Sequence, residues 1–278
     1  MSEILPLRKN ALGDFLRARR AEVRPTEVGL PLGVNARRVP GLRREEVAQL
    51  AGISSDYYNR LEQGRLMPSA PVLAAIGRGL KLDTDQTAYL RRLVQGAPHG
   101  SVSRPLQTVG PQTARLIALL GPVSVVVFGR CLDVLGWNAV AAELLGDFSA
   151  CPANERNFIR MAFLDPGVRA RYVDWETSGR QCVAYLRMDM ARYPDDARLN
   201  ALVSELSEKD ADFRTWWTSH QVAIPSCGQK SVMHPVVGQL TLDWQMLGCA
   251  EDPDQMIYIM SAPSGQPAAN VLAGWQNR

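Results

Sequence analysis

Side chains that can hydrogen-bond to DNA base edges are concentrated in one short segment of this 278-residue chain. Helical spacing turns Tyr58 and Leu61 inward, so that the polar residues around them lie on the outward side or flank of a helix. The polar residues, in chain order, are Ser54, Ser55, Asp56, Tyr57, Asn59 and Arg60. Polar groups near the start of an exposed helix can be placed in the major groove of a duplex, so this segment predicts DNA contact.

A tight turn joins this segment to a preceding helix expected over residues 43–51. Ala48 and Ala51 belong to the buried face of that helix, and Gly52 can end it in the left-handed conformation at low cost. Ser54 is a favourable N-cap for the helix that follows. An ordinary helical hairpin also uses a glycine turn, but the order of residue types favours a helix-turn-helix.

The chain around the turn supports a family assignment. The residues that carry it are Ala48, Gly52, Ser54, Leu61, Glu62 and Gly64, with helices expected over 11–23, 70–80 and 83–94. Residues 10–95 thereby resemble the lambda-repressor-like, or XRE-type, helix-turn-helix domain. The resemblance implies that Ser55, Asp56 and Arg60 face the bases, that Asn59 is a weaker contact, and that Arg44 stands at a phosphate-contacting position.

The segment between the first two helices departs from the family, whose linker is only a few residues long. Residues 24–42 are rich in Pro, Gly and Arg, and the prolines argue against a helix there. The arginines at its end are Arg37, Arg38, Arg43 and Arg44. We interpret them as a basic arm along the phosphate backbone. The alternative is a solvated loop whose arginines pair with Glu45 and Glu46.

Charge divides the chain at about residue 95. Residues 1–95 hold 16 Lys and Arg against 10 Asp and Glu, a net charge of +6, and residues 96–278 carry −3. A basic first part beside a mildly acidic second part fits nucleic-acid binding at one end only. We expect a DNA-binding domain over 1–95, a linker over 96–111 and a second domain over 112–278.

Composition indicates a cytoplasmic protein without a cofactor. The first residues, MSEILPLRKN, lack the apolar stretch of a signal peptide, and no apolar run is long enough to span a bilayer. The five cysteines are dispersed without a CxxC pair, which is typical of reduced thiols. No spacing of His, Cys or carboxylates predicts a metal site.

The second half of the chain predicts an α+β fold, with strands at both ends and helices between them. Strands are expected over 124–128, 130–137, 238–244 and 256–262, with a hairpin turn at Gly129–Arg130. Helices are expected over 139–145, 157–164, 168–190, 199–206 and 211–220. The fold class is therefore an all-α helix-turn-helix domain followed by an α+β domain.

Four phrases of the second half support another family assignment. They are GRCLDVLGWNAVAAELLG, FIRMAFLDPGVRARYVDW, ALVSELSEKDADFRTWWTSHQV and HPVVGQLTLDW. They resemble the ligand-binding half of the bacterial MmyB-like transcriptional regulators. The resemblance implies a PAS-like fold, with helices over one face of a sheet, that encloses a small apolar, fatty-acid-like ligand.

Ligand pockets are mostly apolar, with a few placed polar groups. Candidate wall residues are Trp137, Phe158, Met161, Phe163, Trp175 and Trp217. Candidate partners for a carboxylate or another polar group are Arg160, Tyr185, Arg187 and His234. The alternative makes these residues structural, with Arg160 paired to Asp165 or Glu155 and the aromatic rings in the core. Cys227 lies near His234, but no orienting acid stands at a recognisable spacing, so an enzyme is not predicted.

The two halves together predict a sequence-specific DNA-binding transcriptional regulator under the control of a small apolar ligand. We expect a homodimer on a palindromic stretch of double-stranded DNA, because one short recognition helix reads few bases. In the alternative, the second domain binds no ligand and serves only dimerisation or contact with a protein partner.

Overall fold

The computed structural model describes residues 4–31, 40–95, 107–153, 155–194, 196–222 and 226–276. The chain divides into two compact units, of which the first comprises residues 1–101 together with 187–200 and 216–223. The second unit comprises residues 102–186, 201–215 and 224–278. No helix in the described part of the chain combines the length and the apolar character that crossing a bilayer requires.

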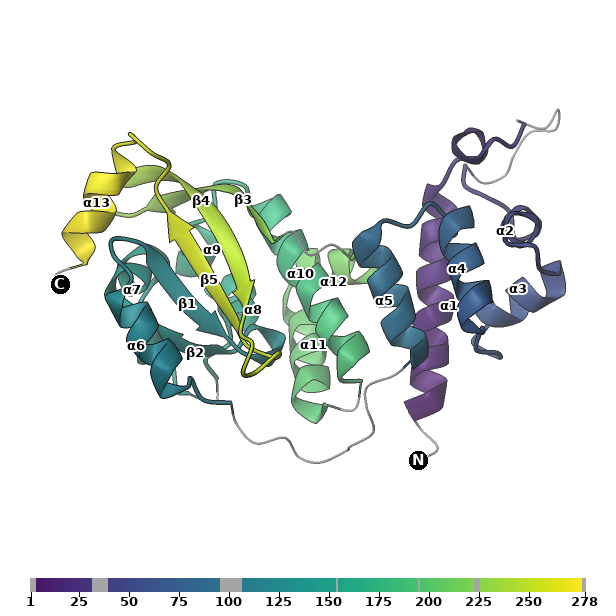
Figure 1. Ribbon diagram of the computed structural model, residues 1–278, viewed down its shortest axis with the longest axis horizontal. Coiled ribbons are helices and arrows are strands. Elements are labelled where there is room, and N and C mark those ends of the chain that lie inside the picture. Colours follow the sequence, from purple (N-terminus) through teal and green to yellow (C-terminus); the bar gives the residue numbers. More distant parts are fainter. Residues whose placement is uncertain are drawn as a thin grey trace. The chain divides into compact units, whose positions relative to one another are not determined.

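Five helices of the first unit, labelled in Figure 1, carry a core of large apolar side chains. They are α1 (Ile4–Glu22), α2 (Arg44–Ala51), α3 (Ser55–Glu62), α4 (Ala70–Gly79) and α5 (Thr84–Gln95). Helix α1 packs against α3 and α5, and α2 packs against α3 and α4. Phe15 of α1 is fully buried, with its ring centroid 5.0 Å from that of Tyr89 on α5. Burying such aromatic surface is a main source of stability for this bundle.

The turn between α2 and α3 has the expected form. Gly52 ends α2 with φ of 66°, a left-handed conformation that a residue without Cβ adopts at little cost. Ser54 caps α3. The expectation that residues 24–42 hold no helix is wrong for one turn, because Pro25–Val28 form a short 3-10 helix. Proline is tolerated there because its position is the first of the helix.

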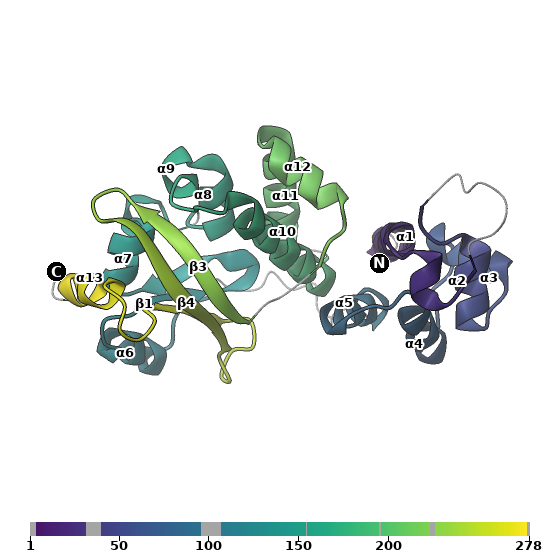
Figure 2. The ribbon, with the colours of Figure 1, turned by 90° about the horizontal axis from the view of Figure 1, so that it is seen from above.

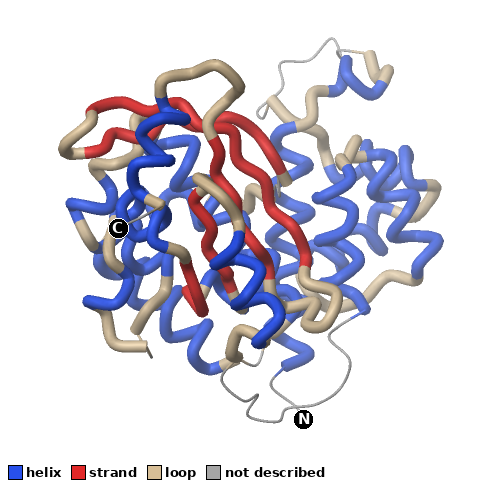
Figure 3. The backbone as a smooth tube through the Cα atoms, turned by 60° about the vertical axis from the view of Figure 1, so that its left-hand side comes forward, coloured by secondary structure: helices blue, strands red, loops and turns tan. Residues whose placement is uncertain are grey.

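The second unit is built on one five-stranded antiparallel sheet with the order β2-β1-β5-β4-β3, seen in red in Figure 3. The strands are β1 (Ser124–Phe128), β2 (Val134–Trp137), β3 (Cys227–His234), β4 (Gly238–Gly248) and β5 (Met256–Ser261). Strand β1 lies between β2 and β5, and all five of its residues are buried. This arrangement confirms the α+β fold expected for the second half.

Helices cover both faces of this sheet, so the expectation of helices over one face only is wrong. The helices in this half of the chain are α6 (Pro111–Leu119), α7 (Ala139–Leu145), α8 (Phe158–Leu164), α9 (Pro166–Arg169), α10 (Trp175–Arg192), α11 (Ala197–Lys209), α12 (Ala211–Thr218) and α13 (Ala268–Trp275). Figure 2 shows α8 and α10 on one side of the sheet and α6 on the other. Ile117 of α6 packs with Val125 and Val127, whereas Phe158 of α8 packs on Phe128 of the opposite face.

The long helix expected over 168–190 is confirmed from Trp175 onward by α10 and is wrong before it, because the chain leaves the helical conformation between Arg169 and Trp175. In that interval Tyr172 forms a β-bridge with Val232, and the Val173 amide donates to the Ser231 carbonyl oxygen at 3.4 Å. Pairing with β3 therefore competes successfully with the helix.

Four other features differ from the expectation. The connection from β1 to β2 runs through a 3-10 turn at Arg130–Leu132 and is longer than a two-residue hairpin at Gly129–Arg130. Strand β3 and helices α6 and α13 were not expected. Proline and glycine flank both helices in sequence, which gave these segments the composition of loops.

Candidate functional site

The polar face of α3 lies opposite a buried apolar face of the same helix. Tyr58 and Leu61 point into the first unit, whereas Ser55, Asp56 and Arg60 are exposed. Tyr57 and Asn59 are half-buried at the flank. The helix thus presents the side chains expected to read DNA, and its apolar face fixes their direction.

Ser54 and Asn59 already take part in local hydrogen bonds. The Ser54 hydroxyl oxygen accepts from the Tyr57 amide at 3.1 Å, which satisfies one of the free N–H groups at the start of α3. The Asn59 side-chain oxygen accepts from the Gln63 side-chain amide at 3.2 Å. The first role of Ser54 is therefore to begin the helix in the correct place.

Arg60 is the longest exposed donor on α3. Its guanidinium lies 3.9 Å from the Asp56 carboxylate, one helical turn away, and its side chain is 51% exposed. An exposed pair of this kind contributes only about 0–1 kcal/mol, so the guanidinium can exchange the carboxylate for a base at little cost. Arginine is well suited to guanine, whose two acceptors match its paired donors.

Glu62 ties α3 to the two helices beside it through ion pairs with Arg20 of α1 and Arg44 of α2. Its carboxylate is fully buried and accepts from Arg20 Nε at 2.6 Å and from Arg44 Nε at 2.7 Å. Burial alone would raise the pKa of Glu62, but the hydrogen bonds from the two arginines outweigh it and lower the pKa. The side chain of Arg44 remains 48% exposed, so its outer N–H groups can donate to phosphate while Glu62 holds the rest.

Arg43 lies at the cap of α2 and is exposed. Its guanidinium lies 3.5 Å from the Glu45 carboxylate, and its amide donates to the Glu46 carboxylate at 2.6 Å. The pairing considered as the alternative to a basic arm is therefore present at Arg43. Arg37 and Arg38 lie outside the described residues, and their contact with phosphate stays a prediction.

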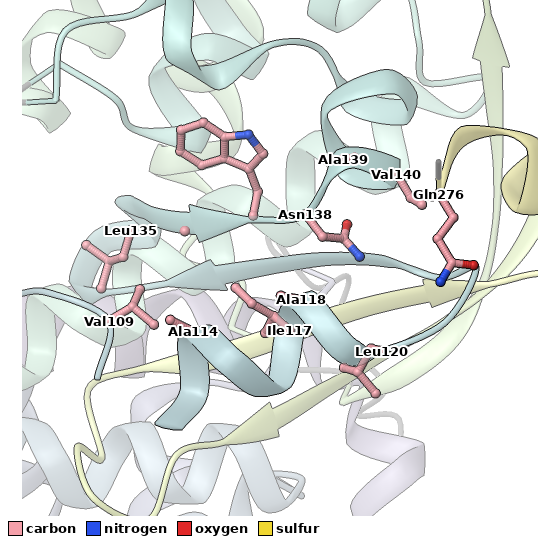
Figure 4. A pocket seen from close by; sticks show the side chains of 12 residues that line it. Val109, Ala114, Ile117, Ala118, Leu120, Leu135, Asn138, Ala139, Val140 and Gln276 are labelled. Carbon is pink, nitrogen blue, oxygen red and sulfur yellow. The ribbon is translucent and has the colours of Figure 1, made fainter. Parts of the chain in front are cut away.

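The second unit has a pocket of about 490 Å³ between α6, β2 and α7. Figure 4 shows Val109, Leu135 and Ile117 along it, with the amides of Asn138 and Gln276 at one end. Its lining is mainly apolar and includes no charged side chain. The Asn138 amide is occupied, because it donates to the Val123 carbonyl and accepts from the Val125 and Ala141 amides. The pocket suits an apolar group, and its described lining holds no cation that could pair with a carboxylate.

Comparison with protein families assigns both halves of the chain. Residues 109–273 match the model described as the MmyB-like transcription regulator ligand binding domain, and residues 11–90 match a helix-turn-helix domain. The chain belongs to the MmyB-like transcription regulators. No curated protein matches this MmyB-like regulator. Its helix-turn-helix and its ligand-binding domain make it a DNA-binding transcription regulator.

The aromatic residues predicted to line a pocket do not come together in the MmyB-like regulator. Trp137 lines the pocket of Figure 4 and also packs on Phe148, at 5.4 Å between ring centroids. Phe163 packs between Trp175 and Phe213, at 4.9 and 5.3 Å. Phe158 packs on Phe128 of the sheet, and Met161 is half-buried on α8. Trp217 lies beside Arg187 in the first unit.

The polar candidates already have partners within the protein. Arg160 Nε donates to Glu205 at 3.0 Å, and its guanidinium lies 3.7 Å from Glu155. The Tyr185 hydroxyl contacts the sulfur atoms of Met246 and Met256.

Arg187 is buried in the first unit, where it donates to the Trp217 carbonyl and lies 3.1 Å from His220 Nδ1. Burial, reinforced by Arg187, lowers the pKa of His220 to about 4. His234 bridges β3 to α7, because Nδ1 accepts from the Val236 amide and Nε2 therefore donates to the Glu143 carbonyl at 3.1 Å. Among the described residues no group of three or more His, Cys, Asp or Glu could hold a metal ion.

One polar group was missed by the sequence reasoning. Lys230, on β3, lies among the rings of Tyr172, Trp244 and Tyr258. These residues come from four separate segments, and β3 itself was not expected. The sequence holds no signal for this cluster apart from a lysine in a strand that alternates imperfectly.

Proposed function

We propose that this regulator binds a palindromic operator as a homodimer and that a small, fatty-acid-like ligand in its second unit changes its affinity for DNA. The observation that carries the proposal is the exposed polar face of α3. The buried side chains of Tyr58, Leu61 and Glu62 fix the orientation of this helix. The helix has eight residues, so a single copy contacts few base pairs. Two copies reach successive half-sites about 34 Å apart, one turn of the duplex.

The ligand would act by linkage. A small molecule can shift a protein only by its different affinity for two states, and such couplings are commonly about 1–3 kcal/mol. The family match gives the second unit a ligand-binding role, and the resemblance to MmyB-like regulators favours a fatty-acid-like molecule.

A second candidate role is favoured by the surface of α6. Leu119 is 75% exposed and Leu116 is also exposed, on the helix whose Ile117 and Ala118 line the pocket of Figure 4. Exposed apolar patches mark contact with other proteins. In this role the second unit serves dimerisation or partner contact and binds no ligand.

The proposal is tested by selecting bound sequences from random duplex DNA with the purified full-length protein. We expect two related half-sites in inverted repeat, a footprint that covers both, and a native mass of two chains per duplex. A single protected half-site bound by one chain would contradict the homodimer.

Arg60→Ala tests the reading face. We expect it to reduce discrimination between the selected operator and scrambled DNA by about 1–3 kcal/mol, if Arg60 contacts one base through two hydrogen bonds. Arg78→Ala is the matched control, because Arg78 is an exposed arginine at the end of α4. Unchanged discrimination with Arg60→Ala would remove Arg60 from the contacts to bases.

A further inference from the structure

Lys230 is a cation beside three aromatic rings, on the face of the sheet that α8 and α10 cover. Its Nζ lies 5.4 Å from the ring centroid of Tyr172, 5.5 Å from that of Trp244 and 5.9 Å from that of Tyr258. The side chain is half-buried, and burial lowers the pKa of the ammonium group. The local surroundings therefore disfavour the charge that this lysine carries.

No carboxylate in the described part of the chain offsets this charge. Within the described ranges, no carboxylate forms an ion pair with Lys230 and no oxygen accepts a hydrogen bond from its Nζ. Two arginines of the second unit do have carboxylate partners, since Arg160 pairs with Glu205 and Arg169 with Asp210. A desolvated cation–π contact stabilises a cation by about 2 kcal/mol, whereas removing one ion from water costs several kcal/mol. The rings alone therefore do not offset the desolvation of Lys230.

The polar groups around Lys230 are neutral hydrogen-bond donors. Burial raises the pKa of the Cys182 thiol to about 11, and burial raises the pKa values of Tyr172 and Tyr258. The thiol lies close enough to interact electrostatically with Lys230 and with both tyrosines. An ammonium, a thiol and two hydroxyls can all donate a hydrogen bond to an anion. None of these groups carries the negative charge that would balance the ammonium group of Lys230.

An apolar row leads away from Lys230 across the same face of the sheet. The ring of Trp244 on β4 lies 5.7 Å from that of Tyr258 on β5, which lies 5.9 Å from Phe128 on β1. Phe128 in turn lies 5.3 Å from Phe158 of α8. Met246 pairs with Tyr258 across the strands, and methionine side chains rearrange readily around a bound molecule.

We propose that Lys230 binds the acidic head group of the ligand, which is an amphipathic molecule with one negative charge and an aliphatic tail. The Cys182 thiol and the hydroxyls of Tyr172 and Tyr258 are the further donors to that head group, and the tail follows the apolar row. This assignment rests on the proposed ligand-sensing function and deepens it. It places the head group away from the uncharged pocket of Figure 4 and away from Arg160 and Arg187.

The test measures binding of three probes to the full-length protein by titration calorimetry. The probes share a twelve-carbon chain and differ in the head group, namely dodecanoate, dodecanol and dodecyltrimethylammonium. We expect dodecanoate to bind most tightly and the cation most weakly. Equal or tighter binding of the cation to the unmodified protein would overturn the assignment without any variant.

Lys230→Met then isolates the charge, because methionine keeps an unbranched apolar side chain. We expect dodecanoate affinity to fall by about tenfold or more, as for the loss of one charge-assisted hydrogen bond, and dodecanol affinity to change less than about twofold. Lys230→Arg should retain most of the dodecanoate affinity. Lys209→Met is the control, because Lys209 is an exposed lysine paired with Glu205.

The possible failures are distinguishable. If dodecanoate binds Lys230→Met as tightly as the unmodified protein, ligand sensing stands and the role of Lys230 is overturned. If none of the probes binds the unmodified, folded protein, the proposed sensing of fatty-acid-like molecules fails and the assignment of Lys230 fails with it.

Discussion

Glu62 in the first unit and Lys230 in the second are both at least partly buried, but among the described residues only Glu62 has ionic partners. Its carboxylate lies 2.6 Å from Arg20 Nε and 2.7 Å from Arg44 Nε. Lys230 faces three rings, a thiol and no carboxylate among the described residues. A buried charge whose partners belong to the same chain serves the fold, whereas an unpartnered one costs stability and is available to a ligand.

The comparison predicts its largest effect at Glu62. Glu62→Gln leaves Arg20 enclosed without a counter-charge, and we expect the free energy of unfolding of the first unit to fall by about 3–5 kcal/mol. Urea unfolding followed by amide hydrogen exchange of α1 and α3 measures it. Glu45→Gln, which breaks only the exposed pair with Arg43, should cost about 0–1 kcal/mol. Equal effects of the two substitutions would remove the distinction between buried and exposed pairs.

The stability that Glu62 contributes should depend on pH. The pKa of Glu62 is lowered in the folded protein from an ordinary value of 4.5, so the folded state binds fewer protons than the unfolded state. The stability that the carboxylate contributes is therefore fully present above about pH 4.5 and is lost as the pH falls through its folded value. The difference in stability between the unmodified protein and Glu62→Gln should shrink from pH 7 to pH 3. A constant difference over that range would show that Glu62 does not titrate with folding.

A smaller effect is expected at the cap of α3. Ser54→Ala removes the acceptor for the Tyr57 amide and should lower the free energy of unfolding by about 1 kcal/mol. Ser55→Ala, one position further on the exposed face, should change stability by less than about 0.5 kcal/mol. Thermal unfolding of both variants measures this. If Ser55→Ala costs more than Ser54→Ala, the helix does not begin where the structure places it.

The smallest effect, and one of opposite direction, is expected at Lys230. Lys230→Met removes a charge that no carboxylate offsets, so we expect thermal stability without ligand to stay unchanged or to rise by about 1 kcal/mol. Arg160→Met, which breaks the pair with Glu205, should lower stability instead. A loss of several kcal/mol with Lys230→Met would mean that the lysine serves the fold as Glu62 does.

The two regions also differ in how far sequence alone predicts them. The residues that form the exposed face of α3 are contiguous in sequence. The turn is predicted from Gly52, the cap from Ser54, and the buried side from Tyr58 and Leu61. Local signals of this kind survive folding because caps and helical periodicity act over a few residues. The two-domain fold class and both family assignments were predictable for the same reason, since they depend on contiguous phrases.

The cluster around Lys230 was not predictable, because cross-strand register decides it. Lys230 pairs with Leu242, while Trp244 and Tyr258 reach it from β4 and β5. A shift of one residue in any strand would turn its side chains to the other face. Strand β3 itself was hidden by Gly228 and its polar neighbours, which have the composition of a turn.

The most direct test of the account is the affinity of the full-length protein for its selected operator, measured by fluorescence anisotropy with and without saturating dodecanoate. We predict a change in Kd of about 5–150-fold, the range of ordinary coupling energies, and its loss in Lys230→Met. An identical Kd with and without dodecanoate, in protein shown to bind the acid, would contradict the control of DNA binding by the second unit.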